Sequence, residues 1–338
     1  MTKVVNKKNW NKIYTVSTEG PCNLSCLGCG SPRKYSERTL GKIIIDIEKG
    51  AKLGYERIEI IGGEPTVHKD VLLIFALARK LYKYVNLTTN GIRLADKNFC
   101  NKIFSFVDEI NISLDGSEAR IHEAWTKKKG SFEKTIQGIK NCLNISVAKT
   151  SVTHLIWQGN YNNIREMLLL DLDLGLEKIS LLNLQPIGRA KEKYAQLAIK
   201  LSDLKNFDLS FIDIIKNFRI FDLEDFPYCI FSEKLLKLQA KNVNIVDIAG
   251  QFFVDDNKRI NAYDLFMVHD LGVGVDSTHE VQKNIDEYSS LLSEYRVYLE
   301  PCLKCKNSQL CNGIFRTYVD VFGKINSEKE IDSLIKKK

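Results

Sequence analysis

The sequence predicts an α/β protein: a partial barrel of six β–α units, followed by a smaller C-terminal α+β region. Two observations predict the barrel. Short segments rich in β-branched residues alternate with helical apolar stripes between residues 12 and 190. Unusual residues, among them cysteines and glycine pairs, come directly after these short segments. The alternation stops near residue 220, so we expect a barrel over 12–220 and a second, smaller domain over 221–338.

The expected elements follow one another regularly. Strands are predicted at residues 12–17, 57–61, 84–88, 109–114, 145–157 and 178–184. Helices are predicted at residues 37–53, 71–81 and 96–106, from residue 131, and at 164–170, where apolar residues recur every three or four positions. Units of this length imply parallel strands joined by right-handed crossovers. Eight units close a barrel, so six predict one that is open on one side.

Five loops with unusual residues each follow a predicted strand. They contain PCNLSCLGC (21–29), GGEP (62–65), TNG (89–91), SLDG (113–116) and QPIGR (185–189). In α/β proteins such loops share the carboxyl edge of the sheet, where sites are built. We therefore expect these five loops to meet in one pocket.

The first of these loops carries three thiols, at Cys22, Cys26 and Cys29. Thiolates are soft ligands that suit iron–sulfur clusters and zinc. A cubane cluster usually takes four cysteines, so three would leave one iron open to a small molecule. A zinc loop that takes a fourth ligand from elsewhere is the alternative.

Composition and charge argue against several classes of protein. The net charge of +7 is modest, and the lysine runs 127–129 and 336–338 lack interleaved aromatic residues, so nucleic acid is not an expected partner. No apolar run has membrane-spanning length and no signal peptide precedes the first strand, which predicts a cytoplasmic protein without membrane contact. In that reducing compartment, nine cysteines are expected to bind metal more than to form disulfides.

With the cysteine triplet, GGEP, TTNG and ISLDG in this order, the chain resembles the radical S-adenosylmethionine (SAM) superfamily over residues 12–190. The resemblance implies a TIM-like partial barrel and a 4Fe–4S cluster on Cys22, Cys26 and Cys29 that binds SAM at its open iron. It also implies reductive cleavage of SAM to a 5′-deoxyadenosyl radical, which takes a hydrogen atom from a substrate. An electron donor such as flavodoxin or ferredoxin would serve the cluster.

The resemblance also assigns roles to the residues of GGEP. Gly62 and Gly63 would let the backbone approach the methionine part of SAM. Glu64 would orient its amino group, and Pro65 would fix the turn. Relatives usually have an aromatic residue before the third cysteine, near the adenine. This chain has Gly28 there, which leaves only a backbone contact with SAM.

Three further residues are implied as SAM contacts. Ser113 alternates with apolar residues and would face the barrel interior. Thr89 would touch SAM or substrate, with ordinary turn chemistry as an equal alternative. Arg189 would pair with the SAM carboxylate or a substrate anion, unless it is a surface arginine.

Cys302, Cys305 and Cys311 resemble the auxiliary-cluster domains called SPASM and twitch, which implies a second iron–sulfur cluster. A full SPASM core would have a cysteine where Phe315 stands, so Cys229 is the candidate fourth ligand, and zinc is the alternative metal. Cys100 and Cys142 lie within predicted helices and are expected to be buried. The molybdopterin-precursor cyclase family has an arginine at the position of Glu59 and a longer gap between its last cysteines, so the chain is not assigned to it.

The leading hypothesis is therefore a radical SAM enzyme that modifies peptides or proteins, or oxidises or rearranges small molecules. Only about eleven residues precede the first strand, which leaves no room for a leader-binding domain and favours a substrate recognised without one. An RNA-modifying radical SAM enzyme and a non-catalytic, zinc-stabilised binding protein are the alternatives. The pattern of the C-terminal half also predicts a hairpin over residues 241–259.

Overall fold

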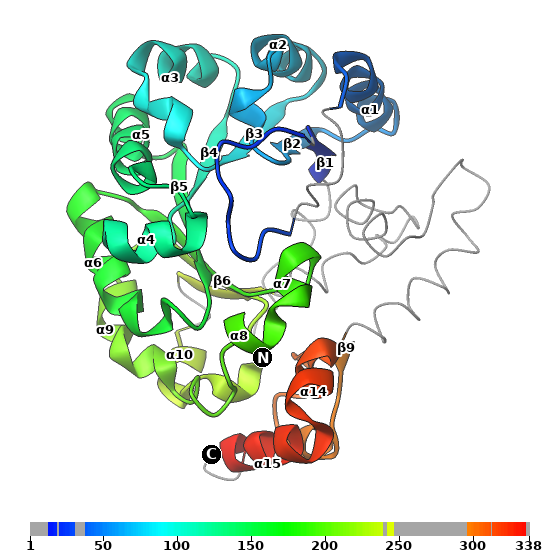
Figure 1. Cartoon of the computed structure of the whole chain (residues 1–338), viewed down its shortest axis with the longest axis vertical. Helices are drawn as coiled ribbons and strands as arrows, with labels where there is room; N and C mark the ends of the chain where they lie inside the picture. The colour runs from blue at the N-terminus through cyan, green and yellow to red at the C-terminus, as the bar shows by residue number, and fades with distance from the viewer. Residues whose placement is uncertain are drawn as a thin grey trace.

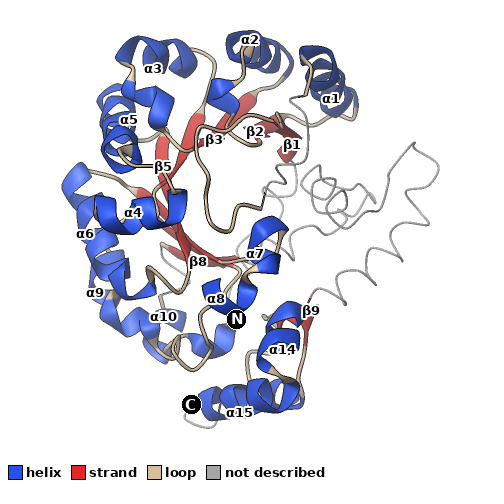
Figure 2. Ribbon diagram, in the orientation of Figure 1, coloured by secondary structure: helices blue, strands red, loops and turns tan. Residues whose placement is uncertain are grey.

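A computed structural model of the chain describes residues 13–18, 20–30, 38–238, 242–246, 296–311 and 313–335. Eight parallel strands form one sheet in sequential order, and an arc of helices covers its outer face (Figures 1 and 2). The strands are β1 (Ile13–Ser17), β2 (Arg57–Ile61), β3 (Tyr84–Thr89), β4 (Glu109–Ser113), β5 (Thr150–Ile156), β6 (Lys178–Asn183), β7 (Ile220–Glu224) and β8 (Val243–Val246). The predicted α/β class is confirmed.

The helices follow the strands as the alternation predicts. They are α1 (Leu40–Lys52), α2 (Val71–Leu81), α3 (Lys97–Phe104), α4 (Ala119–Thr126), α5 (Ser131–Ile145), α6 (Ile164–Leu174), α7 (Gly188–Glu192), α8 (Tyr194–Leu197), α9 (Ile212–Ile215) and α10 (Glu233–Leu236). Short 3-10 turns lie between them at Pro65–Val67, Ile92–Ala95, Tyr161–Asn163, Phe207–Ser210 and Tyr228–Ile230 (η6). Helix α4 was not expected from the sequence, because only Ile121 and Trp125 among its eight residues are large and apolar.

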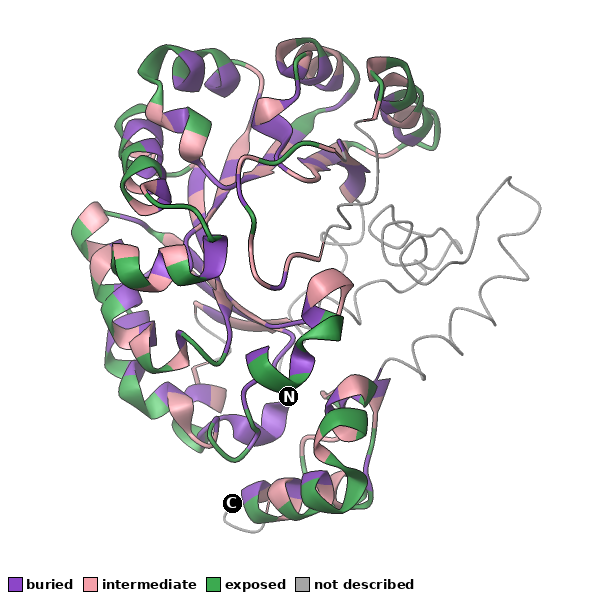
Figure 3. Ribbon diagram, viewed as in Figure 1, coloured by how far each residue is buried: buried purple, intermediate pink, exposed green. Residues whose placement is uncertain are grey.

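The main core lies between the sheet and its helices (Figure 3). On β2, Ile58 and Ile60 are fully buried on the side of the helices. Glu59 lies between them and faces the opposite side, because successive side chains of a strand alternate. The inner face of the sheet is therefore free to carry polar groups.

The sheet has two strands more than the six that the sequence predicts. Strand β7 pairs in parallel with β6, and β8 pairs in parallel with β7. Asp222 interrupts the apolar pattern of β7, and β8 has four residues, so neither produces a strong β–α signal. Val243–Val246 of the predicted hairpin form β8, and the rest of that hairpin, residues 241 and 247–259, lies outside the described part. The sheet runs past residue 220, and the division into two domains stays a prediction.

The described C-terminal residues form a small α+β unit. Strands β9 (Arg296–Val297) and β10 (Ile314–Phe315) pair antiparallel, and α14 (Arg316–Phe322) and α15 (Lys324–Ile335) follow. A 3-10 turn, η7 (Glu300–Lys304), lies between the two strands. The Tyr318 hydroxyl accepts a hydrogen bond of 2.8 Å from the backbone N–H of Leu201, which ties this unit to the barrel. Across the described ranges, each helix is too short or too polar to span a bilayer.

Candidate active site at the carboxyl edge of the sheet

The cysteine loop leaves β1 and lies over the carboxyl edge of the sheet (Figure 1). Its first residues are held to β2, because the backbone N–H of Thr18 donates to the carbonyl of Ile61 at 2.7 Å. Cys22 is exposed, while Cys26 and Cys29 are half-buried. Three soft thiols on one short loop are the donor set that iron–sulfur clusters use.

The three thiols lie near enough to influence one another electrostatically. Burial raises the pKa of Cys26, and the charges of Asp115, Cys29 and Cys22 raise it further. A thiolate at this position therefore needs cations beside it, which iron would provide. Among the residues that the structure describes, no three His, Cys, Asp or Glu side chains are placed to share a single metal ion.

Glu64 joins the GGEP loop to the TTNG loop. Its carboxylate is 2% exposed and accepts the backbone N–H of Thr66 at 3.0 Å and the Thr66 hydroxyl at 2.5 Å. It also accepts the Thr89 hydroxyl at 2.6 Å and the backbone N–H of Asn90 at 2.7 Å. Burial raises the pKa of Glu64, while these donors oppose that shift. Pro65 is buried and starts the 3-10 turn that Glu64 caps.

The same two loops contact the cysteine loop. The Asn90 amide donates to the Asn23 side-chain oxygen at 2.7 Å. A β-carbon on Gly63 would lie 2.7 Å from the carbonyl oxygen of Gly20, so only glycine fits there. Gly62 has a φ of 143°, which favours glycine. GGEP and TTNG therefore shape the cysteine loop directly.

The QPIGR loop reaches the cysteine loop from β6. The backbone N–H of Arg189 donates to the carbonyl of Cys29 at 3.1 Å. Gly188 has a φ of 50°, and a β-carbon there would lie 2.6 Å from the same carbonyl oxygen. Nε of Arg189 is buried and has no hydrogen-bond partner among the described residues. An anion beside Cys29 would satisfy it.

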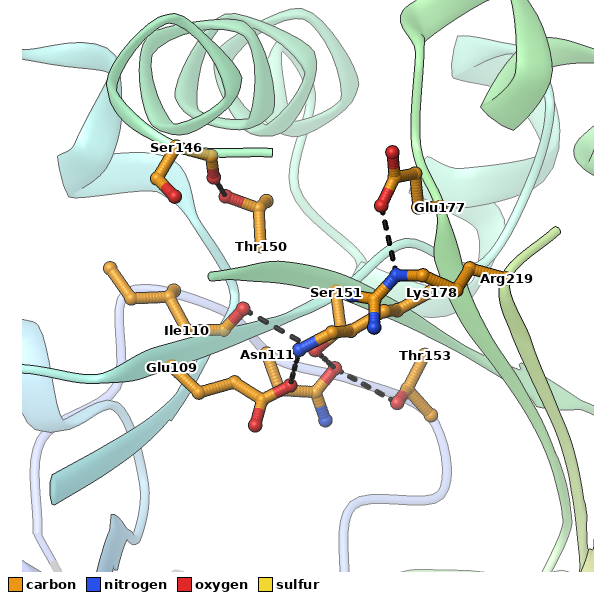
Figure 4. A network of polar contacts seen from close by, with 10 residues as sticks. All are labelled: Glu109, Ile110, Asn111, Ser146, Thr150, Ser151, Thr153, Glu177, Lys178 and Arg219. Carbon is orange, nitrogen blue, oxygen red and sulfur yellow. Dashed lines mark hydrogen bonds and ion pairs between the residues drawn. The ribbon is translucent and has the colours of Figure 1, made fainter. Parts of the chain in front are cut away.

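The inner face of the sheet carries several carboxylates. Glu59, Glu109, Asp222 and Glu224 occupy positions that alternate with fully buried apolar residues of the same strands. Burial raises the pKa of Asp222 to about 6 and that of Glu224 to about 8, and nearby carboxylates add to both shifts. Figure 4 shows Lys178 of β6 reaching Glu109 of β4, at 2.8 Å.

Ser113 lies on this inner face, between the buried Ile112 and Leu114, and its register partner is Thr153. The Thr89 hydroxyl donates to Glu64 and accepts from the backbone N–H of Gly91 at 3.1 Å. That is the turn chemistry that the sequence left open for Thr89.

The C-terminal cysteines line one hollow that is partly open to solvent. Cys229, Cys302, Cys305 and Cys311 all line it. Cys229 is buried and comes from η6, whereas the other three come from η7 and the turns after it. Burial raises the pKa of Cys302, and the charges of Cys311 and Cys305 raise it further. Phe315 is 3% exposed and packs under Arg296, with its ring centroid 3.7 Å from the guanidinium carbon.

Two cysteines and one histidine lie away from these sites. Cys100 and Cys142 are fully buried between α3 and α5, with their sulfurs 3.7 Å apart, which confirms that they are core residues. His154 faces α6, where its Nε2 lies 2.7 Å from Asp171. Sequence reasoning missed Asn23 and Trp125 at the cysteine loop, because both act through contacts between distant segments.

A model of the radical SAM superfamily matches residues 19–172. This range contains the cysteine loop, GGEP, TTNG and SLDG, and it ends within α6. This part of the chain is a radical SAM domain.

Curated relatives of the radical SAM domain include GTP 3′,8-cyclase of Petrotoga mobilis. It is 27% identical over 199 residues, which cover 56% of this chain and 61% of the relative. A probable GTP 3′,8-cyclase of Saccharolobus islandicus is 28% identical over 176 residues, or 50% of this chain and 56% of the relative. The chain thus spans about six-tenths of the length of these curated relatives.

Two solved structures share the fold over most of the chain. SuiB of Streptococcus suis, bound to S-adenosylmethionine, has a TM-score of 0.58 at 16% identity and covers 96% of this chain and 77% of SuiB. The structure of anSMEcpe with bound AdoMet and the Kp18Cys peptide has a TM-score of 0.63 at 19% identity, and covers 95% of this chain and 96% of that one. This likeness extends the shared fold beyond the radical SAM domain.

Proposed function

We propose that the chain is a radical SAM enzyme that binds a 4Fe–4S cluster through Cys22, Cys26 and Cys29. The observation that supports it most is the convergence of GGEP, TTNG and QPIGR on the cysteine loop of a radical SAM domain. When bound there, the cluster and SAM supply a 5′-deoxyadenosyl radical that takes a hydrogen atom from the substrate. An electron donor such as flavodoxin or ferredoxin serves the cluster in a reducing cytoplasm, where thiols stay available as metal ligands.

The surrounding residues bind and orient SAM. Oε2 of Glu64 accepts a hydrogen bond from the backbone N–H of Asn90, and its remaining lone pair suits the amino group of SAM. Arg189 binds the SAM carboxylate or a substrate anion, because its Nε is buried without a partner among the described residues. Ser113 contacts SAM from the inner face, while Gly28, Gly62 and Pro65 keep the surrounding backbone close and fixed.

Cys229, Cys302, Cys305 and Cys311 hold a second, auxiliary iron–sulfur cluster. The support for this is that all four line one hollow, although Cys229 is 73 residues or more before the others in sequence. Four thiolates would close the cluster, since a cubane takes four cysteines. A closed cluster transfers electrons and leaves no iron free for substrate.

The substrate carries no polyphosphate and is a peptide or a small molecule. Glu59, Glu109, Asp222 and Glu224 make the inner wall acidic, and Lys178 is already paired with Glu109. A triphosphate needs several cations, whereas carboxyl groups line this wall, some ionised and some, like Glu224, mainly protonated at neutral pH. This chain therefore differs in substrate from the GTP 3′,8-cyclases that it resembles in sequence.

The test uses protein purified and loaded with iron without oxygen. With dithionite it should convert SAM to 5′-deoxyadenosine, and calorimetry should show binding of SAM but none of GTP. Colourless protein that contains zinc and leaves SAM intact would contradict the enzyme. If GTP bound as tightly as SAM, the proposed substrate class would be wrong, while the proposed radical SAM enzyme would stand.

A further inference from the structure

Gly28, between the second and third cysteines, is a glycine for reasons of space. Its φ is outside the left-handed region, so its backbone conformation is open to other residues. A β-carbon there would lie 2.7 Å from Cη2 of Trp125, and 3.0 Å and 3.2 Å from carbons of Leu197 and Ala190. The Trp125 indole thus occupies the space that a side chain at position 28 would need.

Helix α4, which carries Trp125, also holds the loop through its backbone. The helix ends at Thr126, and the φ of 56° at the following residue, Lys127, leaves the last carbonyls without helical partners. Two of these carbonyls accept hydrogen bonds from the cysteine loop. The backbone N–H of Ser25 donates to the carbonyl of Thr126 at 3.0 Å, and the backbone N–H of Leu27 donates to the carbonyl of Trp125 at 2.9 Å. Side chain and carbonyls of α4 therefore contact the loop on both sides of Cys26.

We propose that Trp125 is a positioning residue for the cluster, which it serves by holding the loop between Cys26 and Cys29 in shape. Its indole is 4% exposed and is itself held by Trp157, with ring centroids 5.2 Å apart. On the other side the loop is held by Arg189 and Gly188 of α7. Loss of the indole lets this stretch of backbone move and changes the spacing of the two thiolates. The inference rests on the proposed cluster site.

The first test measures how fast iron is lost to a chelator from anaerobically loaded protein. Trp125→Leu should lose iron on the order of tenfold faster than the wild type, the range seen when residues that support metal ligands are removed. Trp125→Phe should stay near the wild type, because it keeps an aromatic ring over Gly28. Phe75→Leu is the matched control, since Phe75 is fully buried on α2 and comes from outside the loop. Equal iron loss from Trp125→Leu and Phe75→Leu would overturn the proposal.

The second test moves the aromatic ring from position 125 to position 28. Gly28→Phe alone should lose iron as fast as Trp125→Leu, because the new ring meets the indole. Gly28→Phe combined with Trp125→Ala should regain slow iron loss and the change that SAM causes in the electron paramagnetic resonance spectrum of the reduced cluster. A Gly28→Phe protein that holds iron like the wild type would overturn the proposal. Wild-type protein without iron would instead refute the proposed function.

Discussion

Gly63 is a glycine because the backbone that enters the cysteine loop passes it at contact distance. A β-carbon would lie 2.7 Å from the carbonyl oxygen of Gly20 and 3.1 Å from that of Pro21. The resemblance alone assigns this glycine to the approach of SAM. The structure adds a second demand, since the same glycine lets GGEP lie against the loop that carries the cysteines.

We therefore expect Gly63→Val to lose both iron and SAM binding, and Glu64→Gln to lose mainly SAM binding. The valine forces the cysteine loop away, whereas the glutamine turns one acceptor of Glu64 into a donor that faces other donors. Iron analysis and SAM calorimetry separate the two effects. Gly41→Val on α1 is the control, because a β-carbon there meets nothing within 4 Å. Normal SAM affinity in both site variants would contradict this pocket.

Glu224 makes the stability of the protein depend on pH. Burial and the charge of Asp222 raise its pKa from the usual 4.5 to about 8, so the folded protein keeps a proton that the unfolded chain releases. The contribution of Glu224 to the free energy of unfolding is therefore fully present at low pH. It is lost as pH rises from about 5 to 8, and over this range the free energy of unfolding falls by at most about 1.4 kcal/mol per pH unit. Glu224→Gln should reduce that fall in a series of thermal melts. Parallel wild-type and variant curves across the window would show that Glu224 titrates normally.

Among the elements, the η6 and η7 turns matter most for the second cluster. They bring Cys229 and the group Cys302, Cys305 and Cys311 to one hollow. Phe315, where a further cysteine would complete the SPASM pattern, is instead a core residue packed on Arg296. The fourth thiol near this hollow therefore comes from the barrel side of the chain.

In protein that lacks Cys22, Cys26 and Cys29, about four irons should remain, as expected for one cubane. Cys229→Ala in that background should lose the cluster or convert it to a three-iron form, because one ligand is missing. Iron counts and Mössbauer spectra distinguish a lost cluster, a three-iron cluster and an unchanged four-iron cluster. An unchanged four-iron spectrum would mean that Cys229 is not a ligand and that one iron stays open.

The same elements show what a sequence predicts and what it does not. Strand β2 and helix α2 have the predicted bounds, because their apolar residues are strongly periodic and most of the periodic positions are buried. Strand β7 was missed because Asp222 faces the barrel interior and breaks the apolar run. Motif spacing predicts the cysteine loop and GGEP. The contacts of Asn90 with Asn23 and of Trp125 with Gly28 join segments far apart in sequence, and no local pattern encodes them.

On the scale of the whole molecule, a buried ion pair connects the C-terminal unit to the sheet. Nη2 of Arg296 on β9 lies 3.3 Å from Oδ1 of Asp225, directly after β7, and both side chains are at least nine-tenths buried. Gln185 donates to the other oxygen of Asp225, and the Asp225 backbone N–H donates to Val246 at 2.9 Å. The QPIGR loop, the last strand and the cysteine-bearing C-terminal unit thus meet at one residue.

Asp225→Asn should therefore destabilise the protein by about 3 kcal/mol, because it removes the negative charge that lies beside the buried Arg296 guanidinium. Asparagine tolerates the φ of 62° found at this position, so the backbone effect is small. Glu233→Gln is the control, since it weakens the exposed pair with Lys306 and should cost below about 1 kcal/mol. Urea unfolding of both variants gives the comparison. Similar midpoints would show that the buried pair does not hold the two parts together.

The central claim is that Cys22, Cys26 and Cys29 carry the chemistry. The measurement that tests it most directly is formation of 5′-deoxyadenosine from SAM under dithionite, with iron counted in the same sample. Changing all three cysteines to alanine should remove about four irons per chain and abolish the product. The matched control changes Cys100 and Cys142 to alanine, which should leave iron and product unchanged because these thiols lie in the core. Continued SAM cleavage by the triple variant would contradict the account.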